Sequence, residues 1–165
     1  MKVIQVVGFK NSGKTTVSSN VITYAASKGI KTGSVKHHSH GAPDVVPGTD
    51  SDRHLKSGAT LAGVEGGGIF SVSLQLGDYD FDDILRIYEL IKVEVLVVEG
   101  YKEKNYPKIV CIRNQEDFSL LDSLENVQAV FLHSHLSLPP GYHLPAFTAE
   151  RLDAFEQWID SFINL

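Results

Sequence analysis

Residues 8 to 15 read Gly-Phe-Lys-Asn-Ser-Gly-Lys-Thr, which is a complete G-x-x-x-x-G-K-[ST] phosphate-binding loop. The loop follows Val3-Ile4-Gln5-Val6-Val7, a β-branched run that is typical of a buried strand. After the loop, apolar residues recur at helical spacing until Gly29, which ends the predicted helix. Strand, glycine loop and helix in this order are the context in which the pattern binds a nucleoside triphosphate.

The chemistry of such a loop assigns a role to several of its residues. Gly8 and Gly13 let the backbone curl so that its N–H groups point at phosphate oxygens, and the following helix adds its N-terminal dipole. We expect the Lys14 ammonium to bridge the β- and γ-phosphates and the Thr15 hydroxyl to ligate Mg²⁺. The predicted phosphate-binding residues are therefore Gly8, Asn11, Ser12, Gly13, Lys14, Thr15 and Thr16.

Length and composition predict one ordinary globular domain over residues 1–165. The formal net charge is −5 and no basic run occurs, which argues against nucleic acid as the main ligand. Cys111 is the single cysteine, so an internal disulfide is impossible, and its strand-like surroundings predict an inert buried thiol. Without a signal peptide or an apolar stretch long enough to cross a bilayer, the chain is expected to be cytoplasmic and not bound to a membrane.

Strands and helices alternate along the chain. A hairpin is predicted where Gly66-Gly67-Gly68 joins two strand-like runs, and Asp50 or Ser51 is expected to cap a short helix. The predicted fold class is a three-layer α/β P-loop fold with a mostly parallel sheet plus this antiparallel hairpin. Strands are expected at 3–7, 32–37, 60–65, 69–76, 94–99, 108–112 and 127–132, and further helices at 80–91 and from Leu152 to the C-terminus.

Glu99 ends the apolar run Val95-Leu96-Val97-Val98, which predicts a second Mg²⁺-binding group. Ligands of parallel α/β sheets lie at the carboxyl ends of the strands, where this acid falls. Glu99 would act through a metal-bound water and could also orient the attacking water. The alternative is a structural acid that caps Gly100 and the loop beyond it.

Lys36-His37-His38-Ser39-His40 follows the second predicted strand and precedes several acids. Three imidazoles so close together could bind a transition metal, although no cysteine helps and the spacing is not that of a zinc site. We favour a role at the entrance to the phosphate pocket, where Lys36 or Arg53 meets anionic oxygens and a histidine moves a proton. Asp50 would share the Mg²⁺ shell. A solvated polar loop remains the alternative.

Several blocks together resemble one family. They are Ser12-Gly13-Lys14-Thr15-Thr16, Val35-Lys36-His37 with His40, Pro47-Gly48-x-Asp50-Ser51, Val98-Glu99-Gly100-Tyr101-Lys102 and Leu144-Pro145-Ala146-Phe147. In this order and spacing the chain is similar, over essentially its whole length, to the molybdopterin-guanine dinucleotide biosynthesis adaptor proteins of the MobB type.

The resemblance implies a homodimer that binds GTP, hydrolyses it weakly and assists a guanylyltransferase that joins GMP to molybdopterin. GTP rather than ATP follows from the resemblance alone, because no Asn-Lys-x-Asp base-reading motif occurs. Slow turnover is expected, since Arg53 is the best candidate for an arginine finger and no glutamine is placed to orient water. The predicted catalytic residues are Glu99, Asp50 and Arg53, the metal ligands Thr15, Glu99 and Asp50, and the further ligand-binding residues Lys36, His37 and His40.

Two other classes of function fit the same residues. A small-molecule phosphotransferase or a dethiobiotin-synthetase-like ligase would bind its acceptor around His37 and Arg53. A metal-delivery GTPase would use His37, His38 and His40. An arginine-rich lid would favour the first, and a cysteine beside these histidines or a long histidine tract would favour the second; the sequence has none of these features.

Overall fold

The computed structural model describes residues 1–38 and 47–164, in two compact units. The first unit combines residues 1–37 with 88–165, and the second is residues 38–87. His40, an expected site residue, lies outside the described residues.

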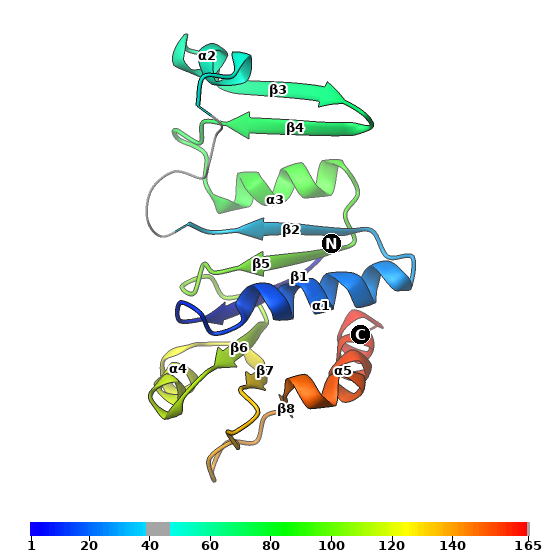
Figure 1. Cartoon of the computed structure of the whole chain (residues 1–165), viewed down its shortest axis with the longest axis vertical. Helices are drawn as coiled ribbons and strands as arrows, with labels where there is room; N and C mark the ends of the chain where they lie inside the picture. Colours follow the sequence, from blue (N-terminus) through cyan, green and yellow to red (C-terminus); the bar gives the residue numbers. More distant parts are fainter. Residues whose placement is uncertain (39–46, 165) are drawn as a thin grey trace. The chain divides into compact units, whose positions relative to one another are not determined.

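The first unit is built on a six-stranded sheet in the order β2-β5-β1-β6-β7-β8, with every neighbouring pair parallel (Figure 1). The mostly parallel α/β fold class is confirmed. The strands are β1 (Lys2–Gly8), β2 (Thr32–Lys36), β5 (Val95–Glu99), β6 (Lys108–Ile112), β7 (Val127–Leu132) and β8 (Ala146–Phe147).

Hydrophobic residues cover both faces of this sheet, as continuous apolar strands require. On one face, α1 (Lys14–Ser27) and α5 (Leu152–Asn164) pack on β1 and its neighbours through Val17, Val21 and Phe155. On the other face, the 3₁₀ turn η1 (Gln115–Phe118) and α4 (Ser119–Ser123) pack Phe118 and Leu120 on β6 and β7. A second 3₁₀ turn, η2 (Ala149–Arg151), precedes α5. The sheet therefore lies between two layers.

A polar residue in the middle of β1 holds the connection between β5 and β6. Gln5 is fully buried, and its Nε2 donates to the carbonyl oxygens of Gly100 and Tyr101, at 3.1 and 2.6 Å. Its Oε1 accepts from the backbone N–H of Tyr106 at 3.2 Å. The crossover, residues 100–107, contains no helix, and Gln5 pairs three of its backbone polar groups.

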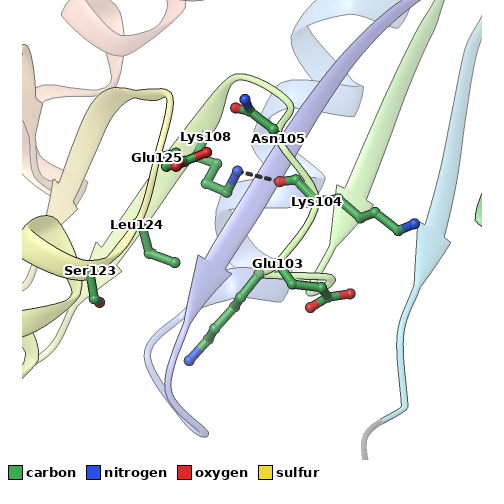
Figure 2. Close-up of a pocket in the computed structure, with 8 residues that line it drawn as sticks. Glu103, Lys104, Asn105, Lys108, Ser123, Leu124 and Glu125 are labelled. Atoms are coloured by element: carbon green, nitrogen blue, oxygen red, sulfur yellow. Dashed lines mark hydrogen bonds between the residues drawn. The ribbon is translucent and has the colours of Figure 1, made fainter.

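The end of the same crossover is held by Lys108, the first residue of β6. Its side chain is 1% exposed, and its ammonium donates to the carbonyl oxygens of Lys104 and Tyr106. Figure 2 shows Lys108 pointing at the Lys104 carbonyl, in the wall of a cavity of about 250 Å³. Burial lowers the pKa of Lys108. Glu103 and Glu125 line the same cavity, and we interpret it as the space beneath the crossover.

The second unit contains α2 (Asp50–Lys56) and a separate antiparallel sheet of β3 (Leu61–Gly66) and β4 (Ile69–Leu74). The predicted hairpin around Gly67 and Gly68 is confirmed. The expected cap of the short helix was wrong by one or two residues: Thr49 is the N-cap, and its hydroxyl accepts from the Asp52 N–H. Thr49 precedes Asp50 in the extended conformation that a cap requires. Helix α3 (Phe81–Leu90) begins in this unit and ends in the first.

Candidate functional site: a phosphate-binding loop with an acid beside it

The phosphate-binding loop joins β1 to α1 at the carboxyl edge of the sheet, as predicted. Gly13 is the N-cap of α1 with φ 85°, in the left-handed region that favours glycine. Gly8 has no room for a side chain, because a Cβ there would lie 2.4 Å from Ser12 Oγ and 2.8 Å from the Cys111 carbonyl oxygen. The first turn of α1 leaves N–H groups without intrahelical acceptors, as anion binding requires.

Lys14 folds back over its own loop. Its Nζ donates to the Phe9 carbonyl oxygen at 2.7 Å. The ammonium therefore lies over the loop in which the phosphates are expected to bind. Ser12 is buried, and its Oγ makes no hydrogen bond among the described residues. Asn11 adopts φ 61°, which turns the backbone at the tip of the loop. Exposed Thr16 occupies the first turn of α1.

Thr15 and Glu99, two predicted Mg²⁺ ligands, are in direct contact. The Thr15 hydroxyl lies 3.0 Å from Glu99 Oε2 and 3.2 Å from Oε1. Glu99 is 8% exposed and ends β5, which pairs with β1 on the side opposite β6. The donor set is one carboxylate and one hydroxyl, both oxygen ligands of the kind that Mg²⁺ prefers, and Mg²⁺ takes its remaining ligands from water and phosphate. The residues therefore fit the expected ion.

Lys36 also contacts Glu99. Lys36 is the last residue of β2, and the parallel register pairs it with Glu99 across β5. Its Nζ lies 2.9 Å from Glu99 Oε1, and its side chain is 53% exposed. The sequence predicted that Lys36 or Arg53 would meet anionic oxygens of a ligand. The structure shows Lys36 paired with Glu99 of the protein itself, and its predicted contact with a ligand stays a prediction.

His37 continues from Lys36 past the end of β2. Its backbone N–H donates to the Glu99 carbonyl oxygen at 2.8 Å, and its ring lies 4.5 Å from the ring of Tyr101, between centroids. Gly100 has φ 96°, and a Cβ there would lie 3.1 Å from that of His37. Gly100 thus lets the histidine lie against the crossover, next to the end of β5.

Asp50 and Arg53 lie on α2 in the second unit. Arg53 Nη1 is 3.5 Å from Asp50 Oδ1, and both side chains are well exposed, so their ion pair adds little to stability. Their predicted roles as a metal ligand and a charge-stabilising arginine stay predictions. His40, predicted to join the same site, lies outside the described residues.

Sequence reasoning missed the cationic side of the loop. The exposed Phe9 ring has the Lys102 Nζ 4.3 Å and the Arg113 guanidinium carbon 5.5 Å from its centroid. Burial and then the nearby Lys14 charge lower the pKa of Lys102. Arg113 Nη1 donates to the Lys10 carbonyl oxygen at 2.8 Å.

A buried acid fixes the position of Arg113. Its Nε donates to Asp117 Oδ2 at 3.0 Å, and Asp117 is 1% exposed. Arg113 comes directly after β6, so the rule that selected Glu99 from the carboxyl end of β5 applies equally to it. That signal was available in the sequence. Arg113 and Glu99 lie on opposite sides of the loop, because β6 and β5 flank β1.

Within the described residues, no group of three or more His, Cys, Asp and Glu side chains is placed to hold a metal ion. The predicted burial of Cys111 is confirmed, and desolvation raises the pKa of its thiol to about 12. In the same part of the chain, no helix combines the length and apolar character needed to cross a membrane.

A parallel sheet whose first strand runs through this loop into a helix defines the α/β fold of P-loop nucleoside triphosphatases. Comparison with known proteins narrows the class. Residues 3–133 match the family model MobB, described as "Molybdopterin guanine dinucleotide synthesis protein B". The chain belongs to the MobB family of molybdopterin-guanine dinucleotide biosynthesis adapter proteins.

Comparison with individual relatives supports the same family. A "Probable molybdopterin-guanine dinucleotide biosynthesis adapter protein" of Bacillus subtilis is 32% identical over 150 residues, which are 90% of this chain and 86% of the relative. The adapter protein of Escherichia coli is 27% identical over 64% of this chain and 62% of its own length.

Solved structures extend the likeness to the whole fold. A MobB homolog from Bacillus stearothermophilus has a TM-score of 0.80 at 31% identity, over 99% of both chains. Bacillus subtilis MobB has a TM-score of 0.77 at 31% identity, over 99% of this chain and 97% of its own. The shared fold therefore continues past the family-model match, through β8 and α5.

Proposed function

We propose that the chain binds Mg²⁺–GTP at the phosphate-binding loop and assists the guanylyltransferase that attaches GMP to molybdopterin. The observation that carries the nucleotide part is the contact of Thr15 with Glu99 beside Lys14, which joins two oxygen ligands for Mg²⁺ to a loop shaped for phosphates. The adapter part is supported by the names of the relatives in Bacillus subtilis and Escherichia coli. The proposed setting is the cytoplasm.

The geometry suggests how the nucleotide lies. We propose that Mg²⁺ and the γ-phosphate bind on the β5 side of the loop, which the contact of Thr15 with Glu99 supports. The α-phosphate and nucleoside would then extend toward β6, where Lys102 and Arg113 concentrate positive charge beside Phe9. In this orientation Lys102 and Arg113, which sequence reasoning missed, would also contact the nucleotide.

We propose that hydrolysis is slow. Fast GTPases depend on an arginine at the transferred phosphate, which contributes about 10³–10⁵ in rate. Arg113 lies beside the loop, but Asp117 and the Lys10 carbonyl hold it on the β6 side, away from Glu99. An adapter needs a nucleotide-dependent state more than it needs turnover, so slow hydrolysis suits the proposed role.

We propose further that the active form is a homodimer that associates through the β3–β4 hairpin. A sheet of only two strands is marginal alone and leaves both edges unpaired. Large apolar side chains on it are well exposed, with Ile69 at 68%, Phe70 at 65% and Val64 at 55%. A second copy of the hairpin would cover these side chains and pair a strand edge.

Nucleotide binding is tested by titration calorimetry with GTP and ATP in the presence of Mg²⁺. Lys14→Ala should abolish GTP binding and leave the circular dichroism spectrum unchanged, because Lys14 contributes charge to the loop and nothing to the core. Lys10→Ala is the matched control, since it removes an exposed lysine of the same loop. Equal GTP affinity in Lys14→Ala and wild type would refute the nucleotide site.

The adapter role is tested by reconstituting guanine dinucleotide formation from purified guanylyltransferase, molybdopterin and GTP. Adding the chain should raise the yield or rate, and Lys14→Ala should not. A His37→Ala, Asp50→Ala double variant should still bind GTP yet lose the stimulation. A metal-delivery protein would instead lose stoichiometric Ni²⁺ or Zn²⁺, and a phosphotransferase would lose phosphorylation of a small acceptor.

The dimer is tested by light scattering after size exclusion. Wild type should have twice the mass of the chain, and Phe70→Ser with Ile69→Ser should have the mass of a monomer. Leu90→Ser, which alters an exposed leucine (80%) of α3, is the control and should remain dimeric. A wild-type monomer at all concentrations would refute the dimer and leave the nucleotide proposal intact.

A further inference from the structure

The ion pair of Lys36 with Glu99 has no role in a simple phosphate-binding loop. Glu99 is buried beside the Thr15 hydroxyl, and a buried carboxylate needs a compensating positive charge. Lys36 supplies that charge, with its Nζ 2.9 Å from Glu99 Oε1. Lys14, the lysine of the loop motif, instead donates to the Phe9 carbonyl oxygen.

The Glu99 carboxylate is also the proposed Mg²⁺ ligand, so Mg²⁺ and the Lys36 ammonium compete for one buried anion. An ammonium and a divalent ion on the same carboxylate repel each other strongly at such short separations. Lys36 can leave, because its side chain is 53% exposed on a flexible stem at the end of β2. Glu99 is held in place, because it is 8% exposed and accepts a hydrogen bond from the Thr15 hydroxyl.

We propose that the Lys36 ammonium occupies Glu99 in place of a divalent cation while nucleotide is absent, so that Mg²⁺ is bound only together with a triphosphate. This inference rests on the proposed nucleotide site and adds its regulation. A triphosphate at the loop brings negative charge that offsets both the metal and the displaced ammonium. Lys36 therefore makes metal binding conditional on nucleotide binding.

The test measures direct binding of Mn²⁺, a paramagnetic substitute for Mg²⁺, to the nucleotide-free protein by electron paramagnetic resonance. Lys36→Met should bind Mn²⁺ at least about tenfold more tightly than wild type, because the competing charge is gone. Lys36→Arg keeps the charge and should match wild type. Glu99→Gln in the Lys36→Met background should abolish the gain, which assigns the bound ion to Glu99.

A second arm adds saturating GTP. The Mn²⁺ affinities of wild type and Lys36→Met should then converge to within about threefold, since the triphosphate offsets the ammonium. Lys36→Gln repeats both arms with a polar side chain, and circular dichroism confirms that each variant is folded.

Equal Mn²⁺ affinity in nucleotide-free wild type and Lys36→Met overturns the proposal, as does the absence of Mn²⁺ binding in every nucleotide-free variant. A gain that persists unchanged with GTP also overturns the link to nucleotide. Failure of wild type to bind GTP with Mg²⁺ refutes the proposed nucleotide function instead, and the nucleotide-free arm does not depend on it.

Discussion

The hydroxyl of Thr15 donates to the carboxylate of Glu99, 3.0 Å away, although 84 residues separate them in the sequence. The contact exists because β5 pairs in parallel with β1, so that the end of β5 lies beside the start of α1. A metal ion bound by one of these two groups would therefore lie within reach of the other.

Glu99→Gln should leave the dissociation constant for GTP within about tenfold but lower the rate of hydrolysis by ~10² or more. The amide still accepts the Thr15 hydrogen bond, but it cannot supply charge to Mg²⁺ or orient water as charge develops. Single-turnover hydrolysis and calorimetry measure the two effects separately. Unchanged hydrolysis would show that Glu99 is structural.

Gly8→Ala should lower stability by about 1–3 kcal/mol, because the new methyl group would meet the Ser12 hydroxyl and the Cys111 carbonyl oxygen. The loop must shift to make room, so GTP affinity should fall as well. Urea unfolding and calorimetry measure the two losses. Gly29→Ala is the control. A Cβ at Gly29 would meet no neighbouring atom, but φ is 77°, so the substitution should lower the free energy of unfolding by about 1 kcal/mol and leave GTP affinity unchanged.

Gln5→Leu should lower the free energy of unfolding by about 2–4 kcal/mol in a urea titration. The substitution keeps the approximate volume but leaves the carbonyl oxygens of Gly100 and Tyr101 and the N–H of Tyr106 without their buried partner. Gln128→Leu, at an exposed position, should change stability by less than about 0.5 kcal/mol. Equal losses of stability in Gln5→Leu and Gln128→Leu would mean that water takes over the hydrogen bonds of the Gln5 amide.

Cys111 should resist thiol reagents at pH 8 in the native protein and react fully in urea. Burial raises its pKa from 9.0 to about 12, so the native state keeps the proton while the unfolded state loses it above pH 9. The unfolded state then binds fewer protons, so this group makes stability fall between about pH 9 and pH 12. Cys111→Ala should reduce that fall, measured by urea titrations at several alkaline pH values.

The sequence predicted the elements that depend on neighbours along the chain. The glycine loop and the apolar strands β6 and β7 are read from local residue types, and their predicted ranges match the structure. The two-residue strand β8 and the short helix α4 escaped prediction, because neither is long enough to show a period. Among site residues, the placement of Glu99 at a strand end was also correct.

Tertiary structure decided which distant side chains meet. The sequence did not show that Lys36 would contact Glu99, which follows from the parallel register of β2 on β5. Gln5 reads as one polar residue in an apolar strand, and only the helix-free crossover gives it its partners. Arg113 likewise gains its position beside the loop from β6 pairing with β1, which brings it to the carbonyl of Lys10.

The physical reason is the range of the interactions concerned. Helical period, turn glycines and caps act over a few residues, so their effects are determined by the sequence of this protein before it folds. The partner of a buried charge depends on strand order, which is fixed only when the whole sheet packs. The sequence by itself therefore determined the phosphate-binding loop motif, and the sheet order decided that Lys36 lies against Glu99.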